Sequence, residues 1–181
     1  GLHNVYNALA AIAVGRELDI PLEAIKRSLE TAEGVQRRLE IKGEIDGITV
    51  VDDYGHHPTE IQVTLEAVRE NWPRHRKVVV FQPHRYTRTQ ALLEEFTRSF
   101  NNSDELVVLP IYAASESPIE GVSGAALAEC VRAHGHRRVI YQESLDACVD
   151  YLATTLESGD LVLTLGAGDV YRVGERILER L

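Results

Sequence analysis

The chemically richest residues of this chain occur together, in the ten-residue stretch 51–60. This stretch reads Val-Asp-Asp-Tyr-Gly-His-His-Pro-Thr-Glu, so it holds two neighbouring carboxylates, a phenol and two imidazoles. Such groups accept hydrogen bonds, bind cations and exchange protons near neutral pH. A lone Asp-Asp pair would indicate only a helix cap with solvated charges. The whole string instead predicts a ligand-binding site.

A strand must lead into this stretch and a helix must lead out of it. The β-branched run 48–51 is typical of a strand. Pro58 suits the first position of a helix, and Glu60 complements the helix dipole in the first turn. The string therefore lies at the carboxyl end of a strand, which is where open α/β sheets bind their ligands.

Strands and helices alternate along the rest of the chain, which indicates a mostly parallel sheet with right-handed crossovers. Several strands are apolar throughout, so helices should cover both faces of the sheet. An Asp46-Gly47 pair predicts a hairpin turn before the first of them. The predicted strands are 48–52, 77–82, 105–110, 138–141 and 161–165, and the predicted helices are 58–71, 90–100, 123–134, 144–157 and 170–181.

The loops after the other strands bring further chemistry to the same edge. His84, Arg85 and Arg88 follow the second strand of the alternating series, and a Gly166-Ala-Gly168 turn follows the last. Arginine holds carboxylates and phosphates through two parallel hydrogen bonds, so the two arginines predict an anion site. The glycine turn resembles a shortened phosphate loop, which is a weak signature without a third glycine.

These residues also have simpler explanations. The alternative for the two arginines is that they form surface ion pairs with the nearest acidic residues, Asp52, Asp53 or Glu116. His56 and His57 have the chemistry of zinc ligands, but adjacent histidines point apart and no cysteine or further ligand is spaced to complete a site. We therefore expect no metal site in this chain.

The composition excludes several classes of function. A formal net charge of −9 argues against a nucleic-acid surface. No apolar run reaches membrane-spanning length, and no signal peptide is recognisable. Cys130 and Cys148 have no motif spacing and are expected to be buried thiols in a reducing cytoplasm. The chain also lacks the Gly-x-x-x-x-Gly-Lys-Ser/Thr phosphate loop.

Residues 1–36 differ from the remainder because they contain no predicted strand. Helical spacing of apolar residues predicts helices over 3–18 and 22–31, with Gly34 ending the second. Two short helices cannot bury a core alone. We expect residues 1–36 to be the end of another domain and residues 37–181 to form a complete one, with 34–38 as the crossover.

Five strings, in this order, resemble the Mur ligase family. They are residues 3–11, 34–38, 52–60, 82–89 and 165–169. They look most like the family branch that joins L-alanine to UDP-N-acetylmuramate in bacterial peptidoglycan precursor synthesis. The resemblance implies a three-domain cytoplasmic enzyme. This chain would hold the last helices of its central ATPase domain and its entire Rossmann-like C-terminal domain.

The family reaction uses ATP to convert the muramate carboxylate into an acyl phosphate, which the amino group of L-alanine then attacks. The resemblance implies that the whole protein requires ATP and Mg²⁺. The P-loop lysine and the magnesium ligands would precede this chain. The chain alone is therefore expected to carry no catalytic residue, to hold no cofactor or metal and to be inactive.

Matching the family motifs position by position implies roles for ten residues. Nucleotide-binding roles, for the adenine, the phosphates and the ribose, fall on Asn4, Asn7, Arg38 and Asp53. Amino-acid-binding roles, with the two arginines on the alanine carboxylate, fall on Tyr54, His56, Arg85 and Arg88. His3 and His84 would support these two groups.

Two alternatives stay open at this point. The ligase that recycles murein tripeptide shares the acidic and histidine string, but it typically has Phe-Ala in place of Tyr54-Gly55 and Glu-Pro-Arg-Ser in place of residues 82–85. A non-catalytic α/β module that binds an amino acid or a nucleotide is the alternative from another class. The expected partners are small molecules (L-alanine, UDP-N-acetylmuramate and ATP) and the N-terminal and central domains of the same protein, with no nucleic acid and no membrane.

Overall fold

A computed structural model describes residues 2–32 and 35–181 of the chain. It divides into two compact units, Gly1–Val35 and Gln36–Leu181, and each is described here by itself. Among the described residues, every helix is too short or too polar to cross a membrane.

The first unit is a pair of helices, α1 (Leu2–Glu17) and α2 (Leu22–Glu30). Both agree with the predicted helices to within one residue. Gly15 lets the two approach closely, because a Cβ built there would lie 2.7 Å from the Cδ1 atom of Ile25. The proposed helix end at Gly34 lies outside the described residues. Most apolar side chains of this unit remain exposed, so the pair buries little core of its own.

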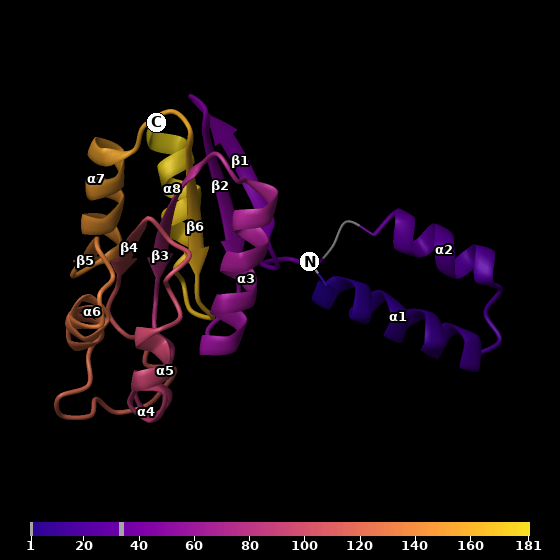
Figure 1. The fold of residues 1–181 in the computed structure, drawn as a ribbon, viewed down its shortest axis with the longest axis horizontal. Helices are drawn as coiled ribbons and strands as arrows, with labels where there is room; N and C mark the ends of the chain where they lie inside the picture. The colour runs from indigo at the N-terminus through magenta and orange to yellow at the C-terminus, as the bar shows by residue number, and fades with distance from the viewer. Residues whose placement is uncertain (1, 33–34) are drawn as a thin grey trace. The chain divides into compact units, whose positions relative to one another are not determined.

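The second unit is built on a six-stranded sheet in the order β1-β2-β6-β3-β4-β5 (Figure 1). The strands are β1 (Glu40–Ile45), β2 (Ile48–Asp53), β3 (Arg76–Phe81), β4 (Glu105–Val108), β5 (Val139–Tyr141) and β6 (Asp160–Leu165). Only β1 runs antiparallel to its neighbour, and every other pair is parallel. The predicted mostly parallel α/β sheet is therefore confirmed.

The turn between β1 and β2 is the predicted two-residue hairpin. Ile45 pairs with Ile48, and Asp46 and Gly47 both adopt left-handed backbone angles, with φ of 51° and 77°. Two successive positive φ values define a type I′ turn, whose twist matches that of the paired strands.

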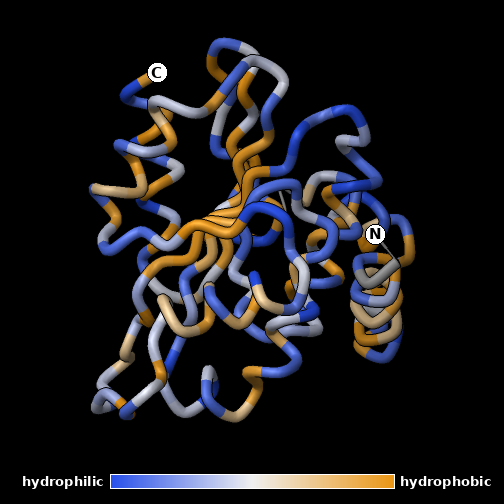
Figure 2. The backbone as a smooth tube through the Cα atoms, turned by 60° about the vertical axis from the view of Figure 1, so that its left-hand side comes forward, coloured by the Kyte–Doolittle hydropathy of each residue, from blue (hydrophilic) through white to orange (hydrophobic). Residues whose placement is uncertain are grey.

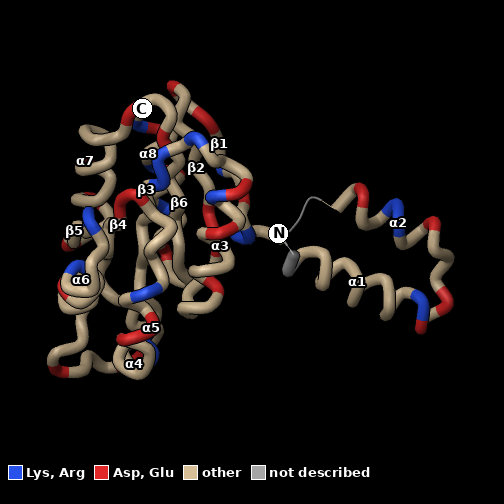
Figure 3. The backbone as a smooth tube through the Cα atoms, viewed as in Figure 1, with Lys and Arg blue, Asp and Glu red and all other residues tan. Residues whose placement is uncertain are grey.

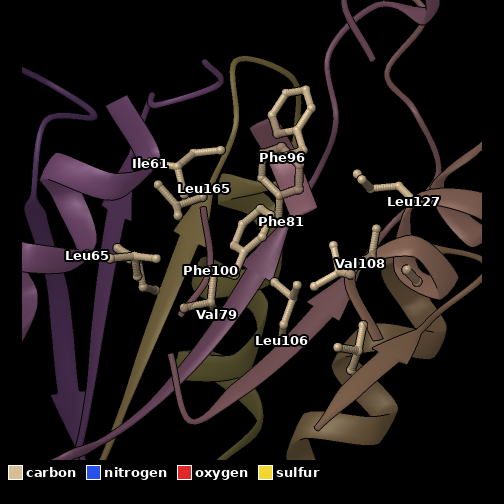
Figure 4. Packing of buried hydrophobic residues seen from close by; sticks show 14 of the residues in the cluster. Ile61, Leu65, Val79, Phe81, Phe96, Phe100, Leu106, Val108, Leu127 and Leu165 are labelled. Carbon is tan, nitrogen blue, oxygen red and sulfur yellow. The ribbon is translucent and has the colours of Figure 1, made fainter. Parts of the chain in front are cut away.

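Helices cover both faces of the sheet. The longer ones are α3 (Pro58–Asn71), α6 (Gly124–Ala133), α7 (Leu145–Thr155) and α8 (Tyr171–Arg180). One core lies between the sheet and α3, α5 (Leu93–Thr97) and α6, and it includes Phe81, Phe96 and Phe100, whose rings pack together (Figure 4). The other core lies beneath α7 and α8.

The strands carry the hydrophobic character of the unit, as the continuous orange band through the sheet shows (Figure 2). Charged residues fall at the ends of the central strands, whose middles are free of charge (Figure 3). The sheet therefore has two charged edges, one where the parallel strands begin and one where they end.

The predicted helix over 90–100 is wrong in both its start and its continuity. Helix α4 (Tyr86–Ala91) begins four residues earlier, and α5 follows after a break at Leu92. The early start could not be predicted from the sequence, because Arg85, the residue before the helix, provides no side-chain cap and has an unusual φ of 73°.

Candidate functional site

The loops that follow β2, β6 and β3 start side by side at the carboxyl edge of the sheet. Asp53, Leu165 and Phe81 are paired in register there. The loops after β2 and β3 lead to helices on one face, whereas the loop after β6 leads to α8 on the other. Neighbouring connections that diverge in this way mark the crevice in which open α/β sheets usually bind their ligands.

Four rings form a continuous aromatic row across these loops: Tyr54, His56, His84 and Tyr112. The ring centroids of Tyr54 and His56 are 5.4 Å apart, edge to face. Those of His56 and His84 are 5.7 Å apart, and His84 stacks on Tyr112 at 5.5 Å. The structure thus brings three of the predicted residues together and adds Tyr112, which the sequence did not single out.

The turn after β6 packs tightly against one end of this row. A Cβ built on Gly168 would lie 2.7 Å from the ring of Tyr112 and 2.3 Å from the side-chain oxygen of Gln82. Only glycine fits there, so close approach to Tyr112 is the reason for this glycine. The likeness to a phosphate loop gains no support from this packing.

Arg85 and Arg88 both lie beside His84. The Nη1 atom of Arg88 is 3.2 Å from Nδ1 of His84. Burial lowers the pKa of His84, and electrostatic interactions with neighbours that include Arg88 and Arg85 lower it further. His84 is therefore a neutral imidazole at neutral pH, in a site whose positive charge comes from arginine.

The alternative explanation for Arg85, a surface ion pair, requires an acidic neighbour, and the structure places Glu116 beside it. Its Nη1 atom is 3.7 Å from Oε1 of Glu116, and about half of its side chain is exposed. Glu116 is held by the backbone N–H of Thr87 at 3.0 Å and its hydroxyl at 2.7 Å, and these bonds lower the pKa of its carboxyl. Arg88 has no carboxylate within 4 Å among the described residues. The ion-pair explanation therefore accounts for one arginine of the two.

Asp52 and Asp53 are buried rather than open to the crevice, with 1% and 3% of their surface exposed. Asp53 accepts hydrogen bonds from the backbone N–H groups of Leu39 (3.0 Å) and Gly55 (2.8 Å) and from the hydroxyl of Thr64 (3.2 Å). Burial raises the pKa of Asp53, and these three bonds oppose the rise. Both oxygens of Asp53 are thus occupied by the chain itself.

His57 and Glu60 form the cap of α3. Nδ1 of His57 accepts from the N–H of Thr59, and Oε2 of Glu60 accepts from the N–H groups of His56 and His57. His57 therefore serves as a helix cap, whereas the ring of His56 belongs to the aromatic row. In the described part of the chain, no three His, Cys, Asp or Glu side chains gather as a metal ion would require.

The remaining predicted residues lie on α1 and next to β1. Asn4 and Asn7 are exposed on α1, with Nδ2 of Asn7 3.5 Å from Oδ1 of Asn4. His3 also falls in α1, and its side chain lies outside the described residues. The guanidinium of Arg38, in the second unit, is half exposed and 3.9 Å from Glu60. Asn4 and Asn7 belong to the first unit, whereas Arg38 belongs to the second.

The sequence missed Arg37, which contacts three parts of the carboxyl edge. Its Nε donates to Asp52, and its two terminal nitrogens donate to the carbonyls of Gly166 and Gly168. Nothing in the Arg37-Arg38 pair distinguishes the partly buried arginine from the exposed one, so no local signal would have found it.

Residues 37–168 match the protein family described as Mur ligase, glutamate ligase domain. The chain belongs to the Mur ligase family. The match covers most of the second unit, including every predicted amino-acid-binding residue and the crossover arginines.

Among Mur ligases, the chain is 62% identical over all 181 residues to UDP-N-acetylmuramate–L-alanine ligase of Desulforapulum autotrophicum, and it covers 40% of that protein. It is 57% identical over the same length to the ligase of the same name from Myxococcus xanthus, covering 38% of it. The chain therefore spans about 40% of the length of the curated relatives it matches.

Solved Mur ligase structures share the fold. UDP-N-acetylmuramate-alanine ligase from Thermotoga maritima superposes with a TM-score of 0.82 at 30% identity, over 99% of this chain and 38% of that one. A murein peptide ligase from Psychrobacter arcticus gives 0.74 at 24% identity, over 99% and 37%. At that lower identity, the likeness shows the common fold alone.

Proposed function

We propose that this chain is the amino-acid-accepting part of a ligase that joins L-alanine to UDP-N-acetylmuramate with the consumption of ATP. The observation that carries the proposal is the pair Arg85 and Arg88 beside a neutral His84 at the carboxyl edge of the sheet. The identity of 62% over the full chain to a UDP-N-acetylmuramate–L-alanine ligase supports the choice of substrates.

In this proposal the two arginines hold the carboxylate of L-alanine. Guanidinium groups bind carboxylates strongly and with defined orientation, so the amino group is turned away from them. Tyr54 and His56 line the pocket beside the amine. Because His84 is neutral, it adds no charge that would repel the positively charged form of the incoming amino acid.

The amine then attacks the carbonyl carbon of the acyl phosphate. The C–N bond forms as the bond from that carbon to the phosphate oxygen breaks, and the amine loses a proton. Phosphate is the leaving group that the carboxylate lacked. The contribution of this chain is to position the nucleophile, a kind of contribution that supplies a large share of many enzymatic rate enhancements.

We also propose that Asn4, Asn7 and Arg38 contact ATP in the whole protein. Their exposed amides and half-exposed guanidinium suit the adenine base and the phosphates. Asp53 fits its implied ribose contact poorly, because both of its oxygens already accept hydrogen bonds within the chain. A ribose hydroxyl would have to displace or share one of these donors.

The first unit is proposed to be the end of the central ATPase domain. Its apolar side chains, such as Val5, Leu9 and Val14, are exposed, as expected of helices that pack within a larger domain. The magnesium ligands and the phosphate loop are assigned to the preceding part of the protein.

The test is phosphate release by the full-length protein supplied with ATP, Mg²⁺ and UDP-N-acetylmuramate. L-alanine and the stem tripeptide are offered in separate reactions. Release that depends on L-alanine supports the proposal. Release with the tripeptide alone would assign the protein to cell-wall recycling, and absence of release with both would favour a non-catalytic binding module.

A further inference from the structure

Arg37 ties together three segments that are distant in the sequence. Its Nε atom is 2.8 Å from Oδ2 of Asp52, at the end of β2. Its Nη1 and Nη2 atoms donate to the carbonyls of Gly168 (3.0 Å) and Gly166 (2.6 Å), in the turn after β6. One guanidinium thereby links the segment before β1 to two neighbouring loops of the site.

The same side chain lies between two tyrosine rings. Its guanidinium carbon is 5.0 Å from the ring centre of Tyr54 and 4.8 Å from that of Tyr171. The Arg37 carbonyl also accepts the backbone N–H of Tyr54 at 2.7 Å. Both the ring and the backbone of Tyr54 are therefore in contact with Arg37.

Through these contacts Arg37 supports both ends of the aromatic row. It contacts Tyr54 at one end directly. At the other end it binds Gly168, on which the ring of Tyr112 packs. Since His56 and His84 lie between Tyr54 and Tyr112, a displacement of Arg37 would affect the whole row.

Arg37 is only partly exposed and all three of its guanidinium nitrogens are bonded within the chain, which suits a residue that acts through other residues rather than on a ligand. Only 21% of its side chain is exposed, against 50% for the neighbouring Arg38. Its backbone has φ of 58°, an unfavourable value for a residue with a side chain. Such a conformation persists when the surrounding contacts over-determine it, and it is common at functional sites.

We infer that Arg37 is a positioning residue that fixes Tyr54 and the Gly166–Gly168 turn, and so shapes the wall of the amino-acid site. This inference rests on the proposed function. Without the guanidinium, the ring of Tyr54 and the turn would become mobile. The binding of L-alanine would then have to order them, at a cost in affinity.

The test is steady-state kinetics of the full-length ligase with Arg37→Lys and Arg37→Ala. For Arg37→Ala we expect the KM for L-alanine to rise about tenfold, while the KM for ATP stays within about twofold. Arg37→Lys keeps the charge opposite Asp52 and protects the fold. It should still raise the KM for L-alanine several-fold, because lysine cannot make three contacts in a planar fork.

Arg76→Lys is the matched control. Arg76 also donates to a buried carboxylate (Asp160, 2.8 and 2.6 Å) and to a backbone carbonyl (Thr155, 3.1 Å), but at the opposite edge of the sheet. We expect this variant to lower the melting temperature and to leave the KM for L-alanine unchanged.

Three results would overturn the inference. If both Arg37 variants lose only stability or active fraction, with an unchanged KM for L-alanine, Arg37 is a structural residue like Arg76. If Arg37→Lys restores the KM completely, the charge matters and the fork does not. If the wild-type protein releases no phosphate in response to L-alanine, the proposed function fails and this inference fails with it.

Discussion

The two edges of the central sheet both contain buried acidic residues that are paired within the chain, but they differ in the groups that they expose. At the amino edge, Arg76 forms a two-bonded ion pair with Asp160. Glu105, which is 1% exposed, accepts the hydroxyl of Tyr151 at 2.6 Å and lies 2.9 Å from Nε of Arg138. The buried charged groups of this edge therefore have partners within the chain.

The carboxyl edge also pairs its buried acids, but it exposes other chemically active groups. Asp52 and Asp53 are bonded within the chain, whereas the side chains of Arg38 and Arg85 are half exposed and the terminal rings of the aromatic row, Tyr54 and Tyr112, are exposed. The difference shows that buried charge alone marks architecture. Exposed cations and rings at the ends of parallel strands mark the site.

The largest effect is expected at the amino edge. Arg76→Ala should destabilise the second unit by about 3 kcal/mol, because it leaves Asp160 buried without its main partner. Urea unfolding of the chain, followed by the fluorescence of its single tryptophan, measures this, since Trp72 packs against the core of that unit. Arg180→Ala, which removes a half-exposed partner of Asp150, is the control and should change stability by less than about 0.5 kcal/mol.

At the carboxyl edge, Arg85→Ala should affect binding rather than stability. We expect the KM of the full-length ligase for L-alanine to rise roughly 30-fold, since a hydrogen bond between charged groups contributes about 2 kcal/mol. The KM for ATP should remain within about twofold. The comparison variant is Arg98→Ala, which removes an exposed arginine paired with Glu94. Equal increases for both substrates would mean that Arg85 serves the structure.

Asp53→Asn examines whether the buried acids of the carboxyl edge are architectural. We expect a loss of about 1–2 kcal/mol, because an amide cannot accept all of the hydrogen bonds that the carboxylate accepts. The variant protein should nevertheless fold, and the same tryptophan signal reports its unfolding.

This loss should also depend on pH. Burial raises the pKa of Asp53 in the folded protein above its ordinary value of 3.8. The stability contributed by protonation of Asp53 is therefore full below pH 3.8 and is lost as the pH rises through the folded-state pKa. Because asparagine does not titrate, the deficit of Asp53→Asn should shrink between pH 4 and pH 7. A deficit that grows with pH would show that the fold stabilises the charged form instead.

The smallest effect is expected for Glu116→Gln. Glutamine can still accept from Thr87 but no longer orients Arg85 by charge, so the KM for L-alanine should rise about threefold. Kinetics of the full-length enzyme measure the change, with Glu120→Gln as a control in the same loop. A lower KM would show that Glu116 competes with the substrate carboxylate for Arg85.

Local signals predicted most of the secondary structure. Helix α3 begins and ends at Pro58 and Asn71 as expected, because proline, the capping residues and the apolar spacing all act within a few residues. The Asp46-Gly47 turn is equally local. The position of β6 between β2 and β3 has no such signal, because it depends on how distant strands compete for partners.

The sequence analysis named several residues of the candidate site but could not predict how their side chains are arranged. The alternation of strands and helices placed His56 and His84 on one edge, and the structure brings their rings within 5.7 Å. The same reasoning included Asp52 and Asp53 in a ligand-binding string, although the pattern of a strand end cannot tell a carboxylate bonded within the chain from one available to a ligand. Arg37 was missed because its partners, Gly166 and Gly168, are contributed by the other end of the unit.

The central place of β6 has a consequence for how the protein is made. β6 is the last strand along the chain, yet it is the neighbour of both β2 and β3. Chains emerge from the ribosome with the N-terminus first, so the β1–β2 hairpin and the β3–β5 group appear before the strand that joins them. Until β6 arrives, each group exposes an apolar edge of the kind that promotes aggregation. The sheet can therefore close only after Leu165 has been synthesised, and a nascent chain stalled before Asp160 is the form that most needs a chaperone.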